Sequence, residues 1–432
     1  MLEAAINSFR IPELRRRIIF TLVILIIFRF IATIPIPGVD RDALNTLLEQ
    51  NQLLGVLNLF SGSTLSNFSI AAMGVYPYIT ASIIMQLMTP IIPKLEELSK
   101  EGESGRRQIN RYQHFLTVPL ALLQGYGQII LMQNQNVIAD FGLFSSDTFL
   151  HSLAILLTLT AGTIVLVWFG ELITESGIGN GISIIIFGGI VASLPASVGN
   201  LLFGGSVQDN VIGTVAFVAL GLLTIVGIVL LNEGQRRIPV HHAKRVRRGR
   251  MYGGSSTFIP LKVNSAGMIP LIFAVSIMVF PGLVANFLTG SERPWLRDLA
   301  GDLANFFDAN TLQYQIVYFI MVVLFTYFYT MVVFQQQNIA ENLQRQGAFI
   351  PGIRPGANTN RYLTGVLTRI TLVGALGLGI VAVLPYFVSQ LTGIQTLFLG
   401  ATSLLIVVGV AIDTMRQLEA QLMMRNYEGF IS

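Results

Sequence analysis

Long apolar segments that are almost free of charged residues recur along the whole chain, and they limit its possible folds more than any other feature. About 20 apolar residues span the roughly 30 Å hydrocarbon core of a bilayer, and a backbone in lipid must satisfy its own hydrogen bonds. We therefore predict an all-α polytopic membrane protein. The pattern predicts ten transmembrane spans, at residues 18–34, 75–92, 115–132, 150–173, 181–198, 211–231, 266–287, 314–334, 370–388 and 396–412.

Positively charged residues are concentrated in one set of alternate loops. Of the 27 Lys and Arg residues, 23 lie before the first span, after the second, sixth and eighth spans, or in the C-terminal tail. Because short loops rich in Lys and Arg remain in the cytoplasm, we expect both termini to be cytoplasmic. Ten spans also divide into two sets of five, which suits two halves of opposite orientation, an inverted repeat.

The N-terminal residues 1–17 combine positive charge with a one-sided apolar pattern. Leu2, Ala5, Ile6 and Phe9 fall on one helical face, which predicts an amphipathic helix at the cytoplasmic membrane surface. No small-residue cleavage site follows the first apolar run, so we expect that run to stay as an uncleaved span.

The segment 61–74, within "FSGSTLSNFSIAAMG", is too apolar for an ordinary loop and too short for a span. A helix over 63–73 would be about 16 Å long at about 1.5 Å per residue. Half-polar backbone at membrane depth survives only when protein or a water-filled cavity surrounds it. We predict a short re-entrant helix on the outer side, with Gly62 and Gly74 as its flexible ends.

Two of the predicted cytoplasmic loops, 233–263 and 335–369, are longer and more basic than topology requires. Arginine clusters bind phosphate and carboxylate groups through paired hydrogen bonds. We expect these loops to dock a large anionic partner, such as ribosomal RNA or an acidic motor protein. The alternative is that the charges only fix the topology.

Catalytic and metal-binding patterns are missing from the sequence. It has no cysteine, its four histidines lack metal-ligand spacing, and no Asp, Glu or His lies in the middle of a predicted span. We therefore predict no enzymatic activity, no metal and no cofactor. Two other classes stay open: a solute transporter built from inverted repeats, and an insertase or scaffold that conducts no soluble chain.

The whole chain resembles the SecY/Sec61-alpha family, the channel-forming subunits of protein translocons. The resemblance runs from "IPELRRRIIFTL" to "NYEGF", through "LFSGSTLSNFSI", "PYITASIIMQL", "EGESGRR", "GIGNGISIIIFGGIV", "AGMIPLIFA" and "FIPGIRPG". It implies a clamshell of two five-helix halves, 18–199 and 200–412, with a cytoplasmic tail at 413–432. It also implies that unfolded presecretory proteins pass through a pore and that transmembrane segments leave sideways into lipid.

The resemblance assigns roles to particular residues of this chain. The pore ring maps to Ile79, Ile83, Ile182, Ile186, Ile272 and Ile406, and the plug that seals it maps to 61–74, including Ser63, Leu65, Asn67 and Phe68. The lateral gate maps to Thr80, Gln124, Asn264 and Phe280, and the docking positions for motor or ribosome map to Arg237, Lys244, Arg245, Arg354 and Tyr427. Of the plug side chains, we expect Leu65, Phe68 and Ala72 to face the ring, and Ser66, Asn67 and Ser69 to face water.

Partners and location are also implied by the resemblance. The small membrane subunits SecE and SecG, the motor ATPase SecA and the ribosome would bind the chain. Signal sequences, nascent chains and membrane lipids would contact it. YidC and SecDF are further partners that the resemblance implies. The implied location is the bacterial cytoplasmic (inner) membrane.

Overall fold

The structure is a computed structural model of the 432-residue chain. It describes residues 11–50, 54–55, 57–58, 61–134, 137–138, 142, 148–203, 211–242, 245–247, 250–252, 256–288, 293–308, 310–392 and 396–428. Most of the amphipathic helix predicted for 1–17 lies outside these residues.

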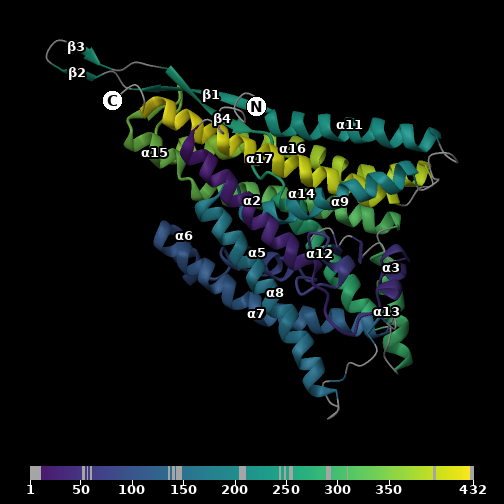
Figure 1. Ribbon diagram of the computed structural model, residues 1–432. Helices are drawn as coiled ribbons and strands as arrows, with labels where there is room; N and C mark the ends of the chain where they lie inside the picture. Colours follow the sequence, from purple (N-terminus) through teal and green to yellow (C-terminus); the bar gives the residue numbers. More distant parts are fainter. Residues whose placement is uncertain are drawn as a thin grey trace. The chain divides into compact units, whose positions relative to one another are not determined.

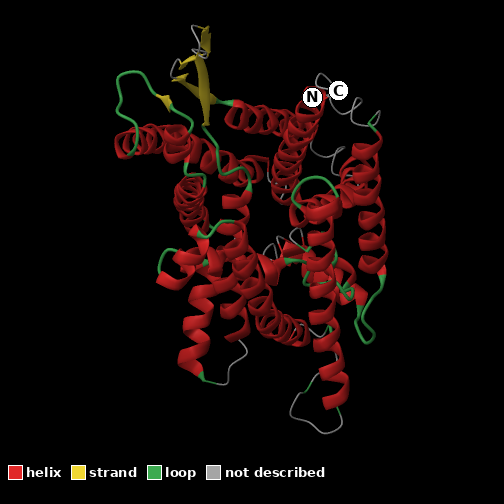
Figure 2. Cartoon of the chain, turned by 90° about the vertical axis from the view of Figure 1, so that its left-hand side faces the viewer, coloured by secondary structure: helices red, strands yellow, loops and turns green. Residues whose placement is uncertain are grey.

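The described chain is mostly helical, and its strands lie together in one region (Figures 1 and 2). The helices are α2 (Pro12–Thr33), α3 (Arg41–Gln50), η1 (Leu65–Asn67), α5 (Tyr76–Met88), α6 (Pro93–Lys100), α7 (Glu103–Asn134), α8 (Phe149–Ser176), α9 (Gly181–Phe203), α11 (Val211–Glu233), α12 (Ile269–Leu288), α13 (Pro294–Phe306), α14 (Leu312–Gln336), α15 (Ile339–Arg345), α16 (Ala357–Thr392) and α17 (Thr396–Glu428). The strands are β1 (Gln235–His242), β2 (Arg245–Arg247), β3 (Arg250–Tyr252), β4 (Ser256–Lys262) and β5 (Ala348–Phe349).

A helix covers most of each predicted span, from α2 for the first to α17 for the tenth. By length and composition, four helical segments of the described residues could cross a membrane alone, namely Glu103–Gln133, Phe149–Ser176, Leu312–Arg345 and Ala357–Phe387. The bent pair α5 and α6 would make a fifth. The chain is therefore a multi-pass membrane protein, and the total of ten spans stays a prediction.

Helix α2 shows how the sequence forms a lipid-facing helix. It begins with Pro12 in its first turn, and it ends where Ile34 becomes extended before Pro35, as residues before proline tend to do. Its buried residues recur every three or four positions, as Leu14, Ile18, Thr21, Ile24, Phe28 and Ala32. The opposite face is also apolar but exposed, with Ile26 at 69% and Phe30 at 68%. A helix that is hydrophobic all round belongs in lipid.

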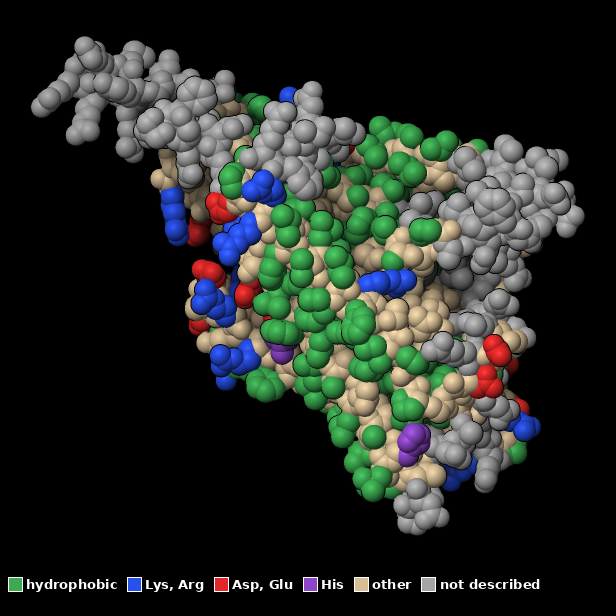
Figure 3. All heavy atoms as spheres, in the orientation of Figure 1, with side chains coloured by type: hydrophobic (Ala, Val, Ile, Leu, Met, Phe, Trp, Pro, Cys, Tyr) green, Lys and Arg blue, Asp and Glu red, His purple; other side chains and the backbone are tan. Residues whose placement is uncertain are grey.

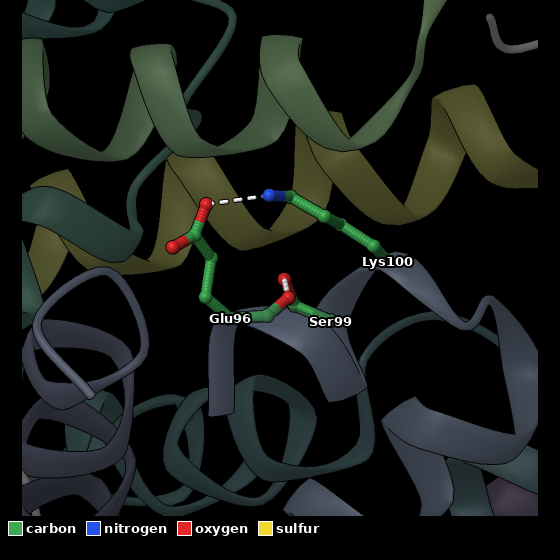
Figure 4. A network of polar contacts seen from close by, with 3 residues as sticks. All are labelled: Glu96, Ser99 and Lys100. Atoms are coloured by element: carbon green, nitrogen blue, oxygen red, sulfur yellow. Dashed lines mark hydrogen bonds and ion pairs between the residues drawn. The ribbon is translucent and has the colours of Figure 1, made fainter. Parts of the chain in front are cut away.

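The chain between α5 and α7 turns sharply at the end of the second predicted span. Helices α5 and α6 meet at 97°, across a break that contains Pro90. In α6, Lys100 Nζ lies 2.6 Å from Glu96 Oε1, and the Ser99 hydroxyl donates to the Glu96 carbonyl (Figure 4). Such pairs one helical turn apart support short exposed helices. In the space-filling view, hydrophobic side chains cover the face over α2 and α5, whereas charged ones gather near α6 (Figure 3).

The chain forms two compact units. The first comprises residues 1–221, 275–316 and 385–432, and the second comprises 222–274 and 317–384. In the first unit α5 packs on α7, and α8 packs on both α7 and α9, while α9 also contacts α2 and α17. The predicted boundary between two five-helix halves at residue 199 stays a prediction.

The second unit contains a small sheet that was not predicted for the basic loops. Strand β1 lies between β4 and β5 and pairs antiparallel with both, with Ile238 opposite Ile259. Ile238 and Val240 are buried, whereas Arg237 and His241 are exposed. The buried face joins a core with residues of α14 and α16: Phe334, Leu363 and Leu367.

Candidate functional site

The segment 61–74 forms a compact loop instead of the regular helix predicted for 63–73. Its only described helical piece is the short 3-10 turn η1. Ser63 and Phe68 have φ values of 61° and 40°, which a right-handed helix cannot include. The Thr64 hydroxyl lies 2.9 Å from the carbonyl oxygen of Ser61 and 2.6 Å from that of Ala71. Side-chain bonds to the backbone compete with helix formation in such Ser- and Thr-rich segments.

The two ends of this loop touch each other. Gly74 has a φ of 57°, and a Cβ on it would lie 2.4 Å from Ser61 Cα. Gly62 also has a positive φ, of 74°. These glycines therefore occupy turn positions that require glycine, a more specific role than the flexible ends predicted from the sequence. A loop with joined ends and its own internal packing is a compact unit of the omega-loop kind. We call residues 61–74 the plug loop.

The apolar side chains of the plug loop are buried, whereas its polar side chains differ in exposure. Leu65, Phe68 and Ala72 are buried, and their facing the ring stays a prediction. Asn67 is exposed and Ser66 is half-buried. The prediction for Ser69 was wrong: its side chain is fully buried, and its hydroxyl donates to the Thr64 carbonyl oxygen. That hydrogen bond removes the cost of burying the hydroxyl.

Backbone hydrogen bonds hold the plug loop against the chain that follows α2. Ile36 N donates to Phe68 O at 3.0 Å, and Ile70 N donates to Ile34 O at 3.1 Å. The Asn67 side-chain amide donates to the carbonyl oxygen of Ala32 at the end of α2.

Three glycines from three helices allow close approach of the plug loop. A Cβ on Gly189 of α9 would lie 2.2 Å from Gly62 Cα, and a Cβ on Gly162 of α8 would lie 2.0 Å from Ile70 O. A Cβ on Gly125 of α7 would lie 3.1 Å from Met73 Sδ. We call Gly125, Gly162 and Gly189 the glycine seat. At two of its three positions, helix backbone lies directly against plug-loop backbone.

The isoleucines assigned to the pore ring lie inside the protein, with one partial exception. Ile79, Ile83, Ile186, Ile272 and Ile406 are all at most 5% exposed. Ile182 is half-buried, and its side chain packs against Gly170 of α8. These five side chains therefore do not face lipid, as the 69% exposed Ile26 of α2 does, whereas ordinary packing between helices fits their burial as well as a pore ring does.

The ring pairs on α5 and α9 are each spaced by one helical turn. Ile79 and Ile83 share one face of α5, and Ile182 and Ile186 share one face of α9. Gly189 of the glycine seat follows Ile186 by three residues, about 4.5 Å along α9. In the first unit, the plug loop therefore contacts α9 about one turn from Ile186, one of the isoleucines assigned to the ring. Closure of a six-residue ring stays a prediction.

Helices α5 and α12 are joined by a hydrogen bond from Tyr76, which was not predicted as a gate residue. The Tyr76 hydroxyl donates to the Ser276 carbonyl oxygen at 3.0 Å. Predicted gate residues Thr80 and Gln124 also meet, since the Gln124 amide donates to Thr80 Oγ1 at 3.2 Å. This second bond joins α5 to α7, so it does not cross to α12. Tyr76 could have been noticed as a phenol in an apolar span, which needs a partner.

The other two predicted gate residues have different surroundings. Phe280 is 41% exposed on α12, one turn beyond Ser276. Asn264 is buried, and its amide donates to Asn232 Oδ1 at 2.8 Å and to the Gly267 carbonyl oxygen at 3.1 Å. Its role in the gate stays a prediction.

The predicted docking residues are described in part. Arg237 is exposed on β1, with its guanidinium 4.8 Å from the centre of the exposed Phe258 ring. Arg354 is exposed in the loop before α16, where its carbonyl oxygen accepts a hydrogen bond from Thr359. Lys244 lies outside the described residues, and of Arg245 and Tyr427 only the backbone is described. Among described residues, no group of three or more His, Asp or Glu could hold a metal ion.

Comparison with known proteins identifies close relatives across the whole chain. A family model described as SecY matches residues 69–415. The protein translocase subunit SecY of Halalkalibacterium halodurans is 44% identical over 441 residues, which cover 100% of both chains.

Solved structures agree with the fold at low sequence identity. A structure described as "The structure of a protein conducting channel" matches with a TM-score of 0.65 and 16% identity over 96% of each chain. Sec61 in the canine ribosome-channel complex from the endoplasmic reticulum matches with a TM-score of 0.60 and 15% identity, again over 96% of each chain.

Proposed function

Because this chain belongs to the SecY family and is the protein-conducting channel of the Sec translocase, we propose that its plug loop seals a passive pore lined by the six assigned isoleucines. A collar of stiff apolar side chains excludes water and ions when empty, yet it offers no hydrogen bond to hold a passing chain. The family is one of translocation channels, and we propose that this chain itself hydrolyses no nucleotide. A partner motor or the ribosome supplies the work.

The observation that carries this proposal is the seating of the plug loop. The loop has joined ends, and it rests on Gly162 of α8 and on Gly189 of α9, the second of which lies about one turn from Ile186. At Gly162 and Gly189, backbone meets backbone, so no side chain of the seat projects between the helix and the loop at these two positions. Close contact of this kind excludes water, as a seal requires.

The seam between α5 and α12 is the proposed lateral gate. The Tyr76–Ser276 hydrogen bond lies in this seam, and polar contacts of this kind contribute roughly 0.6 to 2 kcal/mol in membranes. A signal sequence that packs against the seam can displace so weak a bond. We propose that Tyr76 acts with Thr80, Gln124, Asn264 and Phe280 in this gate.

The proposed orientation places both termini and the basic loops in the cytoplasm, with the chain in the bacterial inner membrane. The exposed Arg237 and Arg354 then face cytoplasmic partners. Sec61 of the canine complex is bound to a ribosome, which supports the ribosome as one partner here. We propose SecA as the second docking partner and SecE and SecG as membrane subunits, with YidC and SecDF as further contacts.

Crosslinking a stalled translocation substrate tests the pore assignment. A photoreactive residue placed in a presecretory chain is expected to crosslink to Ile79 and Ile186 when SecA has driven it halfway across. Crosslinks that reach only lipid-facing positions such as Ile26 would contradict the assignment. A channel that moves a small solute and never crosslinks the chain would instead favour a transporter.

A further inference from the structure

Helix α13 (Pro294–Phe306) was not predicted, and the proposed channel function does not use it. It connects α12 to α14 through two five-residue segments, 289–293 and 307–311. At about 1.5 Å per residue its 13 residues extend about 20 Å, which is too short to cross a bilayer of roughly 30 Å. The short connections nevertheless keep it within about 20 Å of the ends of two spans.

The side chains of α13 divide into three faces around the helix. Trp295, Leu299, Leu303 and Phe306 form an apolar stripe, because their spacing of three or four residues repeats with the helical turn. All four are exposed, from Trp295 at 62% to Leu303 at 36%. They are called the α13 stripe below.

The second face packs against the protein, and the third is polar. Ala300 is completely buried, so the helix rests on its neighbours through this side. Arg297, Asp298, Asp302 and Asn305 are exposed on the remaining side. A helix that contacts only protein and water has a buried side and a polar side. The α13 stripe is a third side, apolar and exposed, so it needs an apolar environment other than the protein itself.

Lipid is the environment that the neighbouring residues indicate. Phe280 and Val284 near the end of α12 are each 41% exposed, and Leu312 and Ile316 at the start of α14 are 53% and 52% exposed. The α13 stripe therefore lies in the chain between two exposed apolar surfaces of membrane helices. Trp side chains are enriched at the boundary between headgroups and acyl chains.

We propose that α13 lies along the membrane interface on the side where α12 ends. Its α13 stripe inserts among the acyl chains close to the headgroups, and its charged face lies in water. Helices of this kind insert their apolar face about 5–10 Å into the boundary region. Which side of the membrane α13 lies on depends on the proposed orientation of the chain. The proposed contact of α13 with lipid does not depend on that orientation.

The chain offers a direct test, because it has two tryptophans. Trp168→Phe leaves Trp295 as the only reporter, and Trp295→Phe leaves Trp168, which is 56% exposed on the spanning helix α8. Each full-length variant is reconstituted in vesicles of dioleoyl phosphatidylcholine or of its analogue brominated at carbons near the headgroup. We expect bromolipid to lower the Trp295 emission roughly twofold, because shallow bromine atoms reach an interfacial ring.

The Trp168 reporter separates the two possible failures. If bromolipids quench Trp168 but not Trp295, α13 contacts water or another subunit, and the inference is wrong while the channel proposal stands. If neither tryptophan is quenched, the proposed membrane arrangement fails as well. If only Trp295 is quenched, α13 contacts lipid, and the assignment of α8 as a membrane-spanning helix is wrong.

A matched pair of substitutions adds a second readout. Leu299→Asp places a charge in the α13 stripe, and Asn305→Asp places the same charge on the polar face. We expect Leu299→Asp to remove most of the bromolipid quenching of Trp295, and Asn305→Asp to leave it unchanged. Equal effects from the two variants would show that the stripe has no special contact with lipid.

Discussion

Replacing Gly189 by alanine tests whether the glycine seat holds the plug loop. Elsewhere in a helix this change is favourable by up to about 1 kcal/mol, because glycine loses more backbone entropy than alanine. At Gly189 the new Cβ would lie 2.2 Å from Gly62 Cα and 2.3 Å from Gly62 O. Since both contacts are to backbone, no side chain can rotate away, and the plug loop itself must move.

The size of the effect on seating follows from the clash alone. Overpacking in a well-packed site typically costs about 1–3 kcal/mol. Because the helix gain applies whether the plug loop is seated or displaced, the clash alone shifts the seating equilibrium. We expect a shift of about 1–2 kcal/mol, which raises the displaced fraction by roughly 5–30-fold.

The assay is the halide permeability of proteoliposomes that contain the resting channel without motor or substrate. Gly127→Ala is the matched control, since Gly127 lies in α7 and a Cβ on it would meet no atom within 4 Å. We expect increased leak for Gly189→Ala and none for Gly127→Ala. A Gly189→Ala channel as tight as the unmodified one, with equal amounts of folded protein, would refute the seating argument.

Three further predictions concern the ring, the gate and the docking loop. Replacing Ile79, Ile186 and Ile406 together by Gly should raise resting ion conductance, because the dewetted collar is lost, and unchanged conductance would count against the ring. Tyr76→Phe removes the hydroxyl that bonds across the α5–α12 seam, so export of a substrate with a weakened signal sequence should rise about fivefold, equivalent to about 1 kcal/mol. No change in that export would exclude this bond from the gate. Arg354→Glu should impair SecA-driven export while channel abundance stays normal, and full export would remove this exposed arginine from the docking surface.

The helices could be predicted from the sequence because each apolar run carries its own signal. Runs such as 150–170 are long and contain no Asp, Glu, Lys or Arg, and a backbone in lipid has few alternatives to a helix. The burial of Leu65 and Phe68 could also be anticipated from their apolar character within a polar segment. Hydropathy decides which side chains avoid water, whatever the local conformation.

The conformation of the plug loop could not be predicted in the same way. Its helical prediction failed because hydroxyl–carbonyl bonds, such as those of Thr64, depend on residues that the folded loop brings together. The glycine seat depends on three helices, so no local pattern around Gly189 reveals it. A buried phenol such as Tyr76 signals the need for a partner, but the sequence does not reveal that partner, because Ser276 lies 200 residues away.

The sheet of the basic loops did have a local signal. In "RRIPVHH" the buried Ile238 and Val240 alternate with exposed residues, which is the period of a half-buried strand. The strand was therefore predictable from this alternation, although the arginines of the loop indicate only a basic surface.

The most direct test of the central claim is transport by the reconstituted complex. Proteoliposomes that contain the chain with SecE, SecG, SecA and ATP receive a presecretory protein, and protease-protected full-length product is measured. The account predicts protected product that requires both SecA and ATP and that falls when the plug loop is crosslinked to α9. Absence of protected product from a folded complex that still passes a small solute would contradict it.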